Sequence, residues 1–265
     1  SFIYLSEKHG EALAHLRYGL ESDGGFVLIT GEVGTGKTTL LRNLIAQVPE
    51  NQDVAFILNP RLTVRELLES LCDELRIDYP IESPLSIKQY IDRLNRHLLH
   101  AHSLNRSTVM IIDEAQNLSP AVLEQIRLLT NLETNERKLL RIILIGQPEL
   151  GKTLDRHELR QLAQRITARY HLEALDSNDI HAYVAHRMRI SGASAEVFTR
   201  AARRSIYRQT RGIPRLINVL CDRCLLGAYV GGTHRVNARI VSRAAKEAFP
   251  QRKFCLLYTS PSPRD

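Results

Sequence analysis

The stretch Phe26-Val-Leu-Ile-Thr-Gly-Glu-Val-Gly-Thr-Gly-Lys-Thr38 decides the fold of this chain. Its first five residues form an apolar run between glycines, which predicts a strand buried on both faces, as in a parallel sheet. Residues 31–38 then match the pattern G-x-x-x-x-G-K-[ST] at every fixed position, and a helix is expected from Lys37 to about Ala46. A buried strand before this loop and a helix after it are the context that a phosphate-binding loop requires, and they disfavour a chance glycine-rich turn.

Residues 31–38, which we call the phosphate loop, have a direct physical role. Glycines let backbone N–H groups turn inward around phosphate oxygens, and the helix that follows points its positive end at the same anion. We expect Lys37 to reach the β- and γ-phosphates of ATP and Thr38 to ligate Mg²⁺. The predicted nucleotide-binding residues are Gly31, Glu32, Val33, Gly34, Thr35, Gly36, Lys37, Thr38 and Thr39, joined by Asp113.

A second apolar strand ends in two carboxylates, Asp113 and Glu114. Two ionised carboxylates at a strand end repel each other unless a cation or a bound water uses them. We expect Asp113 to share the Mg²⁺ with Thr38, and Glu114 to polarise the attacking water as general base. An ordinary surface turn is the alternative, and the presence of the phosphate loop favours the functional interpretation.

Further polar residues follow downstream. Gln147 comes directly after another expected strand, from where it could contact the γ-phosphate or the attacking water; a loop residue of no consequence is the alternative. An arginine presented to a neighbouring subunit's γ-phosphate would stabilise transition-state charge, and Arg165 is our first choice, with Arg160 and Arg169 as alternatives. Arg215, in the first turn of a later helix, could fold over the nucleotide as part of a lid. A solvated basic surface is the alternative for all these arginines.

The periodicity predicts an α/β domain over residues 1–175, an all-helical lid over 176–249 and a disordered or foreign tail over 250–265. Strands that alternate with helices predict a five-stranded parallel sheet flanked by helices, the architecture of a P-loop NTPase. The expected strands are 26–30, 54–58, 109–112, 140–145 and 170–172; the expected helices are 7–19, 37–46, 63–75, 86–102 and 119–129, and, in the lid, 176–190, 195–210, 214–229 and 237–248.

Composition narrows the function class. The chain has 265 residues, 43% of them hydrophobic and 25% charged, which is typical of a globular protein with a core. No apolar run approaches the ~20 residues that span a bilayer, and the first residues lack the basic region followed by an apolar region that is typical of a signal peptide. Four cysteines are too few for a disulfide framework, so a reducing cytoplasm is expected; Cys221 and Cys224 within one helix favour packing over zinc. Because the sequence does not begin with Met, we expect it to begin inside a longer protein.

The net charge of +7 is unevenly distributed. Residues 1–150 carry 15 basic and 20 acidic side chains, whereas residues 151–265 carry 21 basic and 9 acidic ones. Such asymmetry is typical of a nucleic-acid or membrane-surface face, or of arginines that serve phosphate chemistry.

The order of these motifs resembles that of the AAA+ ATPases: phosphate loop, acidic strand end, polar strand end, arginines before the last strand, and Gly212-Ile-Pro-Arg215 in the helical part. Within that family the chain resembles the ExeA/GspA-like secretion ATPases, with the MSHA-pilus biogenesis ATPases as the nearest branch. The similarity covers about residues 5–249. The matching strings are residues 11–20, 30–38, 112–116, 127–133, 146–150, 159–166 and 211–218.

The resemblance implies a Mg²⁺-dependent cytoplasmic ATPase, peripheral at the inner membrane through partners, that powers or regulates assembly of a type II secretion or type IV pilus machine. It also implies a homo-oligomer, or a hetero-oligomer with a second AAA+ subunit. Family members usually begin with a short segment that is absent here, which implies a truncated amino terminus. The secretin-assembly members continue into a membrane span and a peptidoglycan-binding domain, and their absence here favours the pilus-type member or a fragment of a longer one.

A DNA-binding AAA+ ATPase, such as a transposition regulator or helicase loader, is the second hypothesis. The arginines at 200, 203, 204, 208 and 211 motivate it, because helical spacing sets them in one stripe that could contact a nucleic-acid backbone. A solvated helix face is the commoner explanation of such a stripe, so nucleic acid is the less favoured partner. A catalytically inactive nucleotide switch is a third hypothesis, disfavoured by intact Lys37, Asp113 and Glu114.

Overall fold

A computed structural model of the chain describes residues 4, 6–21, 26–58, 60–80, 85–134, 137–193 and 195–249. The chain divides into two compact units, Leu5–Glu173 and Ala174–Asp265 together with Ser1–Tyr4. The first unit contains the β-sheet, and the second contains helices α8 (Ser177–Ile190) to α11 (Ala238–Ala248). The expected tail over 250–265 lies outside the described residues.

The sheet of the first unit has five parallel strands in the order β2-β3-β4-β1-β5. Strand β4 therefore lies between β1 and β3, with Thr30 opposite Gly146 and Ile112 opposite Leu144. All carboxyl ends meet at one edge, so the loops after β1, β3 and β4 are neighbours there. The strands are β1 (Phe26–Gly31), β2 (Gln52–Ile57), β3 (Ser107–Ile112), β4 (Leu140–Gly146) and β5 (Ile166–Leu172).

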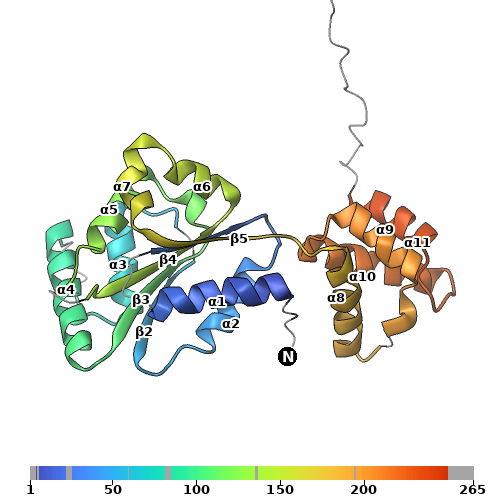
Figure 1. Cartoon of the computed structure of the whole chain (residues 1–265), viewed down its shortest axis with the longest axis horizontal. Coiled ribbons are helices and arrows are strands. Elements are labelled where there is room, and N and C mark those ends of the chain that lie inside the picture. Colours follow the sequence, from blue (N-terminus) through green and yellow to red (C-terminus); the bar gives the residue numbers. More distant parts are fainter. Residues whose placement is uncertain are drawn as a thin grey trace, which may run out of the picture. The chain divides into compact units, whose positions relative to one another are not determined.

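Helices cover both faces of this sheet (Figure 1). Alternate strand residues point to opposite faces: Val27 and Ile29 pack with α1 and α2, whereas Phe26 and Leu28 belong to the core beneath α3 to α7. The resulting three-layer α/β/α unit confirms the predicted fold class. Its helices are α1 (Glu7–Glu21), α2 (Lys37–Ile45), α3 (Val64–Glu74), α4 (Ile87–Ser103), α5 (Pro120–Leu129), α6 (Pro148–Leu154) and α7 (Arg160–Gln164), with short 3-10 turns at Ala115–Asn117 and His157–Leu159.

The helix starts show why these boundaries lie where they do. Thr63 caps α3 through a capping box: its hydroxyl accepts from the Glu66 amide at 3.3 Å, and the Glu66 carboxylate accepts from the Thr63 amide at 2.7 Å. Asp176 likewise caps α8 and accepts from the amides of Asn178 and Asp179.

Three local predictions need correction. Strand β5 has seven residues instead of three; it is an edge strand with alternating burial, so it lacks the apolar run that marks a central strand. The short helices α6 and α7 were not predicted. The expected helix 195–210 is a 3-10 turn at Ala195–Val197 followed by α9 (Arg200–Thr210), because Thr199 caps a new start by accepting from the Ala202 amide.

The second unit is a small helical bundle with its own apolar core. Cys224 is buried in that core, and burial raises the pKa of its thiol to about 12, as expected for a packing residue. Arg203 is half-buried and its Nε donates to the Phe198 carbonyl, while Arg211 lies beyond the end of α9 with a φ of 51°. The expected arginine stripe is therefore not a single solvated face. The remaining helices are α8 (Ser177–Ile190), α10 (Pro214–Val230) and α11 (Ala238–Ala248).

Gly212 holds the start of this unit against α10. Its carbonyl accepts from the Leu175 amide at 3.0 Å, its φ is +78°, and a Cβ built on it would lie 1.8 Å from the Leu175 carbonyl oxygen. Only glycine fits this backbone approach.

We predict that Gly212→Ala lowers the free energy of unfolding by about 3 kcal/mol or more, because left-handed strain adds to a backbone clash. Urea denaturation of the purified protein measures this change. Gly192→Ala is the matched control: its φ is +75° in the same unit, but nothing lies within 4 Å of the added carbon. Equal losses for the two variants would contradict the role assigned to the clash.

Candidate functional site

The phosphate loop runs from the end of β1 to the start of α2, at the carboxyl edge of the sheet. Gly34 and Gly36 have φ values of 85° and 106°, a backbone region that residues with a Cβ rarely adopt. Thr35 is fully buried, and its hydroxyl donates to the Glu32 carbonyl at 2.9 Å. The loop therefore turns tightly into a helix whose first amides lack intrahelical partners, which is a ready anion site.

Lys37 lies inside this turn with 6% of its surface exposed. Its ammonium donates to the carbonyls of Gly31 at 2.7 Å and Glu32 at 3.0 Å, and it forms no salt bridge with any residue that the structure describes. Burial lowers the Lys37 pKa, and the nearby Glu114 and Asp113 oppose this shift. A buried cation without a bonded counter-ion at a helix N-terminus fits a phosphate group.

Thr38 and Asp113 are brought together from distant parts of the chain. The Thr38 hydroxyl donates to Oδ2 of Asp113 at 2.9 Å, and Oδ1 of Asp113 accepts from the Glu114 amide at 2.9 Å. Asp113 is 4% exposed. A hydroxyl and a carboxylate oxygen are ligands that Mg²⁺ prefers, so the pair fits the predicted metal position.

Glu114 is held by two amide side chains. Its backbone is in the left-handed region, with φ 54°, and its Oε2 accepts from Nε2 of Gln116 at 2.6 Å and from Nε2 of Gln147 at 3.4 Å. Oε1 of Gln116 also accepts from the backbone N–H of Gln147 at 3.0 Å. Gln116 is a site residue beyond those predicted from the sequence; its place two residues after Glu114 in the string 112–116 is the available signal.

The other predicted residues are spread more widely. Glu32, Val33 and Thr39 are exposed on or beside the phosphate loop. Arg165 points into its own subunit, because its guanidinium donates to the Arg127 carbonyl at 3.0 Å and to the buried Thr130 hydroxyl at 2.6 Å. Arg160 and Arg169 are exposed, the latter 3.5 Å from Asp155.

Arg215 is exposed at the second position of α10, in the helical unit. Its role at the nucleotide stays a prediction.

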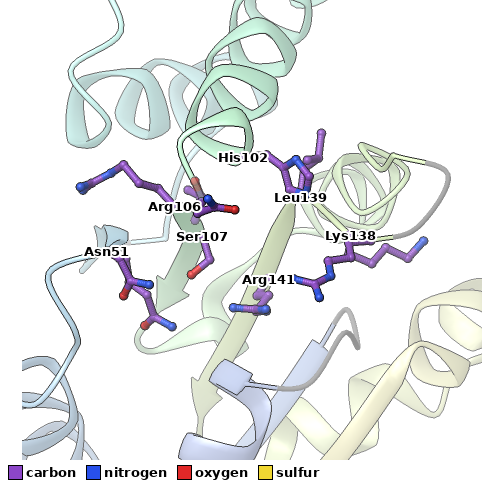
Figure 2. Close-up of a pocket in the computed structure, with 11 residues that line it drawn as sticks. Asn51, His102, Arg106, Ser107, Lys138, Leu139 and Arg141 are labelled. Carbon is purple, nitrogen blue, oxygen red and sulfur yellow. The ribbon is translucent and has the colours of Figure 1, made fainter.

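A cavity of about 320 Å³ lies elsewhere, at the amino ends of β3 and β4 (Figure 2). None of the predicted site residues lines it. Its walls are basic and polar, with Arg106, Lys138 and Arg141 among them, and Arg106 and Lys138 already pair with Asp53 and Glu133. It is therefore distinct from the phosphate loop, which lies at the opposite edge of the sheet.

Within the described residues, no helix is long and apolar enough to cross a bilayer.

Comparison with known proteins adds sequence and fold relatives. A family model described as an AAA domain matches residues 20–154. General secretion pathway protein A of Aeromonas hydrophila is 51% identical over 246 residues, which cover 93% of this chain and 45% of that protein. The chain thus spans just under half the length of this curated relative.

Two solved structures share the fold at low identity. Cdc6p from Pyrobaculum aerophilum aligns with a TM-score of 0.71 at 18% identity, over 93% of this chain and 70% of that chain. The Aeropyrum pernix ORC2 protein, in ADPNP–ADP complexes, aligns with a TM-score of 0.60 at 17% identity, over 91% of this chain and 67% of that chain.

We predict that Arg165→Ala destabilises the protein by about 1–3 kcal/mol, because it removes the charged donor to the buried Thr130 hydroxyl and to the Arg127 carbonyl, which then keep only their 2.7 Å hydrogen bond to each other. Denaturant unfolding measures the change. Arg160→Ala, which removes an exposed guanidinium five residues away, is the control and should change stability by less than about 0.5 kcal/mol. Equal stability of the two variants would show that the Arg165 contacts contribute nothing.

Proposed function

We propose that this chain, which belongs to the family of AAA domains, binds ATP with Mg²⁺ and hydrolyses it in the unit Leu5–Glu173. The observation that carries the proposal is the meeting of the Thr38 hydroxyl with the Asp113 carboxylate beside the buried Lys37 ammonium. This arrangement joins a metal-type ligand pair to a positively charged anion cradle at one edge of the sheet.

ATP binding would use groups that the loop already holds. The amides of the phosphate loop and the start of α2 would donate to phosphate oxygens, and Lys37 would exchange its bonds to the Gly31 and Glu32 carbonyls for the β- and γ-phosphates. Thr38 and Asp113 would hold Mg²⁺, which neutralises phosphate charge when bound.

Hydrolysis would use Glu114 as the general base. Its carboxylate would accept a proton from water as the water oxygen bonds to the γ-phosphorus and the bond from that phosphorus to the β–γ bridging oxygen breaks, releasing ADP and phosphate. Gln116 and Gln147 would orient Glu114 until water enters, because both donate to its Oε2.

The cellular role is inferred from likeness. Half of the aligned residues are identical to those of a general secretion pathway protein. This identity supports a role for the chain in powering or regulating assembly of a type II secretion or type IV pilus machine. The MSHA-pilus branch is the finer proposal. We infer a cytoplasmic homo-oligomer, or a hetero-oligomer with a second AAA+ subunit, that is held peripherally at the inner membrane by envelope assembly proteins.

An oligomer would let one subunit act on its neighbour's ATP. Arg165 is our first choice for the arginine that contacts the neighbour's γ-phosphate, which we call the arginine finger, and Arg160 and Arg169 are the alternatives. Arg215 would fold over the nucleotide from the helical unit of its own subunit. Arg160 needs no rearrangement because it is exposed, whereas Arg165 would have to leave the Thr130 hydroxyl.

DNA binding is the second candidate function. Arg200, Arg204 and Arg208 are exposed one turn apart along α9, a spacing that suits a phosphate backbone. Tight binding of duplex DNA at ~150 mM salt, weakening steeply as salt rises, would favour this function; no binding would favour the secretion role.

We predict that Glu114→Gln lowers ATP turnover by about 100-fold or more and leaves ATP affinity within about threefold, because the amide cannot accept the proton. Phosphate release measures turnover, and equilibrium titration with a fluorescent ATP analogue measures binding. The exposed Glu158→Gln is the control and should match the wild type. Unchanged turnover in Glu114→Gln would exclude Glu114 as the base.

Mixing two inactive variants tests which arginine acts on the ATP of a neighbouring subunit. If an arginine acts in trans, mixing its inactive alanine variant with Glu114→Gln restores up to about a quarter of wild-type turnover, since some interfaces then combine both intact groups. Arg215→Ala is the matched control: a residue that acts within its own subunit gives no recovery in the same mixture. Failure of Arg160→Ala, Arg165→Ala and Arg169→Ala to recover activity would exclude all three as the finger.

A further inference from the structure

His9, in the first turn of α1, contacts the phosphate loop although it lies 22 residues before it. The side chain is 5% exposed, and its Nε2 lies 3.2 Å from the carbonyl oxygen of Thr35. Its Nδ1 lies 2.7 Å from the hydroxyl of Ser6, which is also buried. The nucleotide chemistry described above uses neither residue.

The Thr35 carbonyl fixes the position of one proton on the His9 ring. A carbonyl oxygen only accepts, so Nε2 must carry the proton and donate to Thr35. Nδ1 of the neutral ring is then an acceptor, and the Ser6 hydroxyl donates to it. Removal of the imidazole would leave the Thr35 carbonyl without this donor, and the Ser6 hydroxyl with only the backbone amide of His9, which donates to it at 3.4 Å.

The contact of His9 lies at the part of the phosphate loop that orients the backbone amides expected to face the phosphates. The Thr35 amide and hydroxyl both donate to the Glu32 carbonyl, so the inner side of the turn is already tied. The His9 ring bonds to the outward carbonyl of the same residue and lies directly against Gly36: a Cβ there would be 3.0 Å from Nε2. The loop is therefore held from both sides immediately before Lys37.

We propose that His9 is a positioning residue for ATP binding, which holds the amides of Thr35, Gly36 and Lys37 in their phosphate-binding orientation through the Thr35 carbonyl. The proposal rests on the proposed ATP binding by this loop. Because these amides would contact the phosphates in both the ground state and the transition state, their loss of order weakens binding and leaves the chemical step nearly intact.

The test compares His9→Leu, which keeps the volume and removes the donor, with His9→Gln, which keeps an N–H donor at similar reach. We expect His9→Leu to raise the KM for ATP about five- to tenfold with kcat within about twofold, and His9→Gln to restore most of the affinity. His15→Leu is the matched control: it removes an exposed histidine of the same helix that stacks on Tyr170.

A second readout needs no nucleotide. Hydrogen exchange of the amides of residues 34–37 in the nucleotide-free protein should be faster in His9→Leu than in the wild type and in His15→Leu. Unchanged exchange in this segment, or a KM that Gln does not rescue, would overturn the role of His9. A wild-type protein that neither binds nor hydrolyses ATP would instead refute the proposed function, and the exchange comparison would still decide whether His9 orders the loop.

Discussion

The parallel pairing of β4 with β1 on one side and β3 on the other is the constraint on which the site depends. Side-by-side strands of the same direction end at one edge, so the loop after β1 and the carboxylates after β3 are separated by the width of β4 alone. The Thr38–Asp113 hydrogen bond then closes the remaining gap. The order of these three strands therefore sets the separation between the two motifs.

The electrostatics of this edge are incomplete without a ligand. Burial disfavours the charged form of Lys37, and the nearby carboxylates of Glu114 and Asp113 compensate only in part. A polyanion at the helix N-terminus would supply the missing negative charge. The amide side chains of Gln116 and Gln147 donate hydrogen bonds to the carboxylate of Glu114. These bonds orient the group proposed as base and use one of its oxygens as their acceptor.

Several residues at the site were beyond prediction because their roles come from contacts between distant segments. His9 has no local motif: one histidine in an amphipathic helix is indistinguishable from a packing residue until the phosphate loop is seen against it. The inward direction of Arg165 depends on the Thr130 hydroxyl, which a different helix supplies. Strand β5 is longer than its sequence pattern predicts, because an edge strand with alternating burial carries only half of the apolar signal.

The sequence by itself determined the phosphate loop, four of the five strands and most of the helix starts. These features are encoded locally, because glycine conformations, hydrophobic periods and capping side chains act within a few residues. Only the tertiary structure decided the strand order, the contact of Thr38 with Asp113, the hydrogen bonds from Gln116 and Gln147 to Glu114, and the contact of His9 with Thr35. Most of these features bring together residues that are distant in sequence, and the Glu114–Gln116 contact depends on the turn after β3. No local pattern specifies which distant partner a side chain will contact.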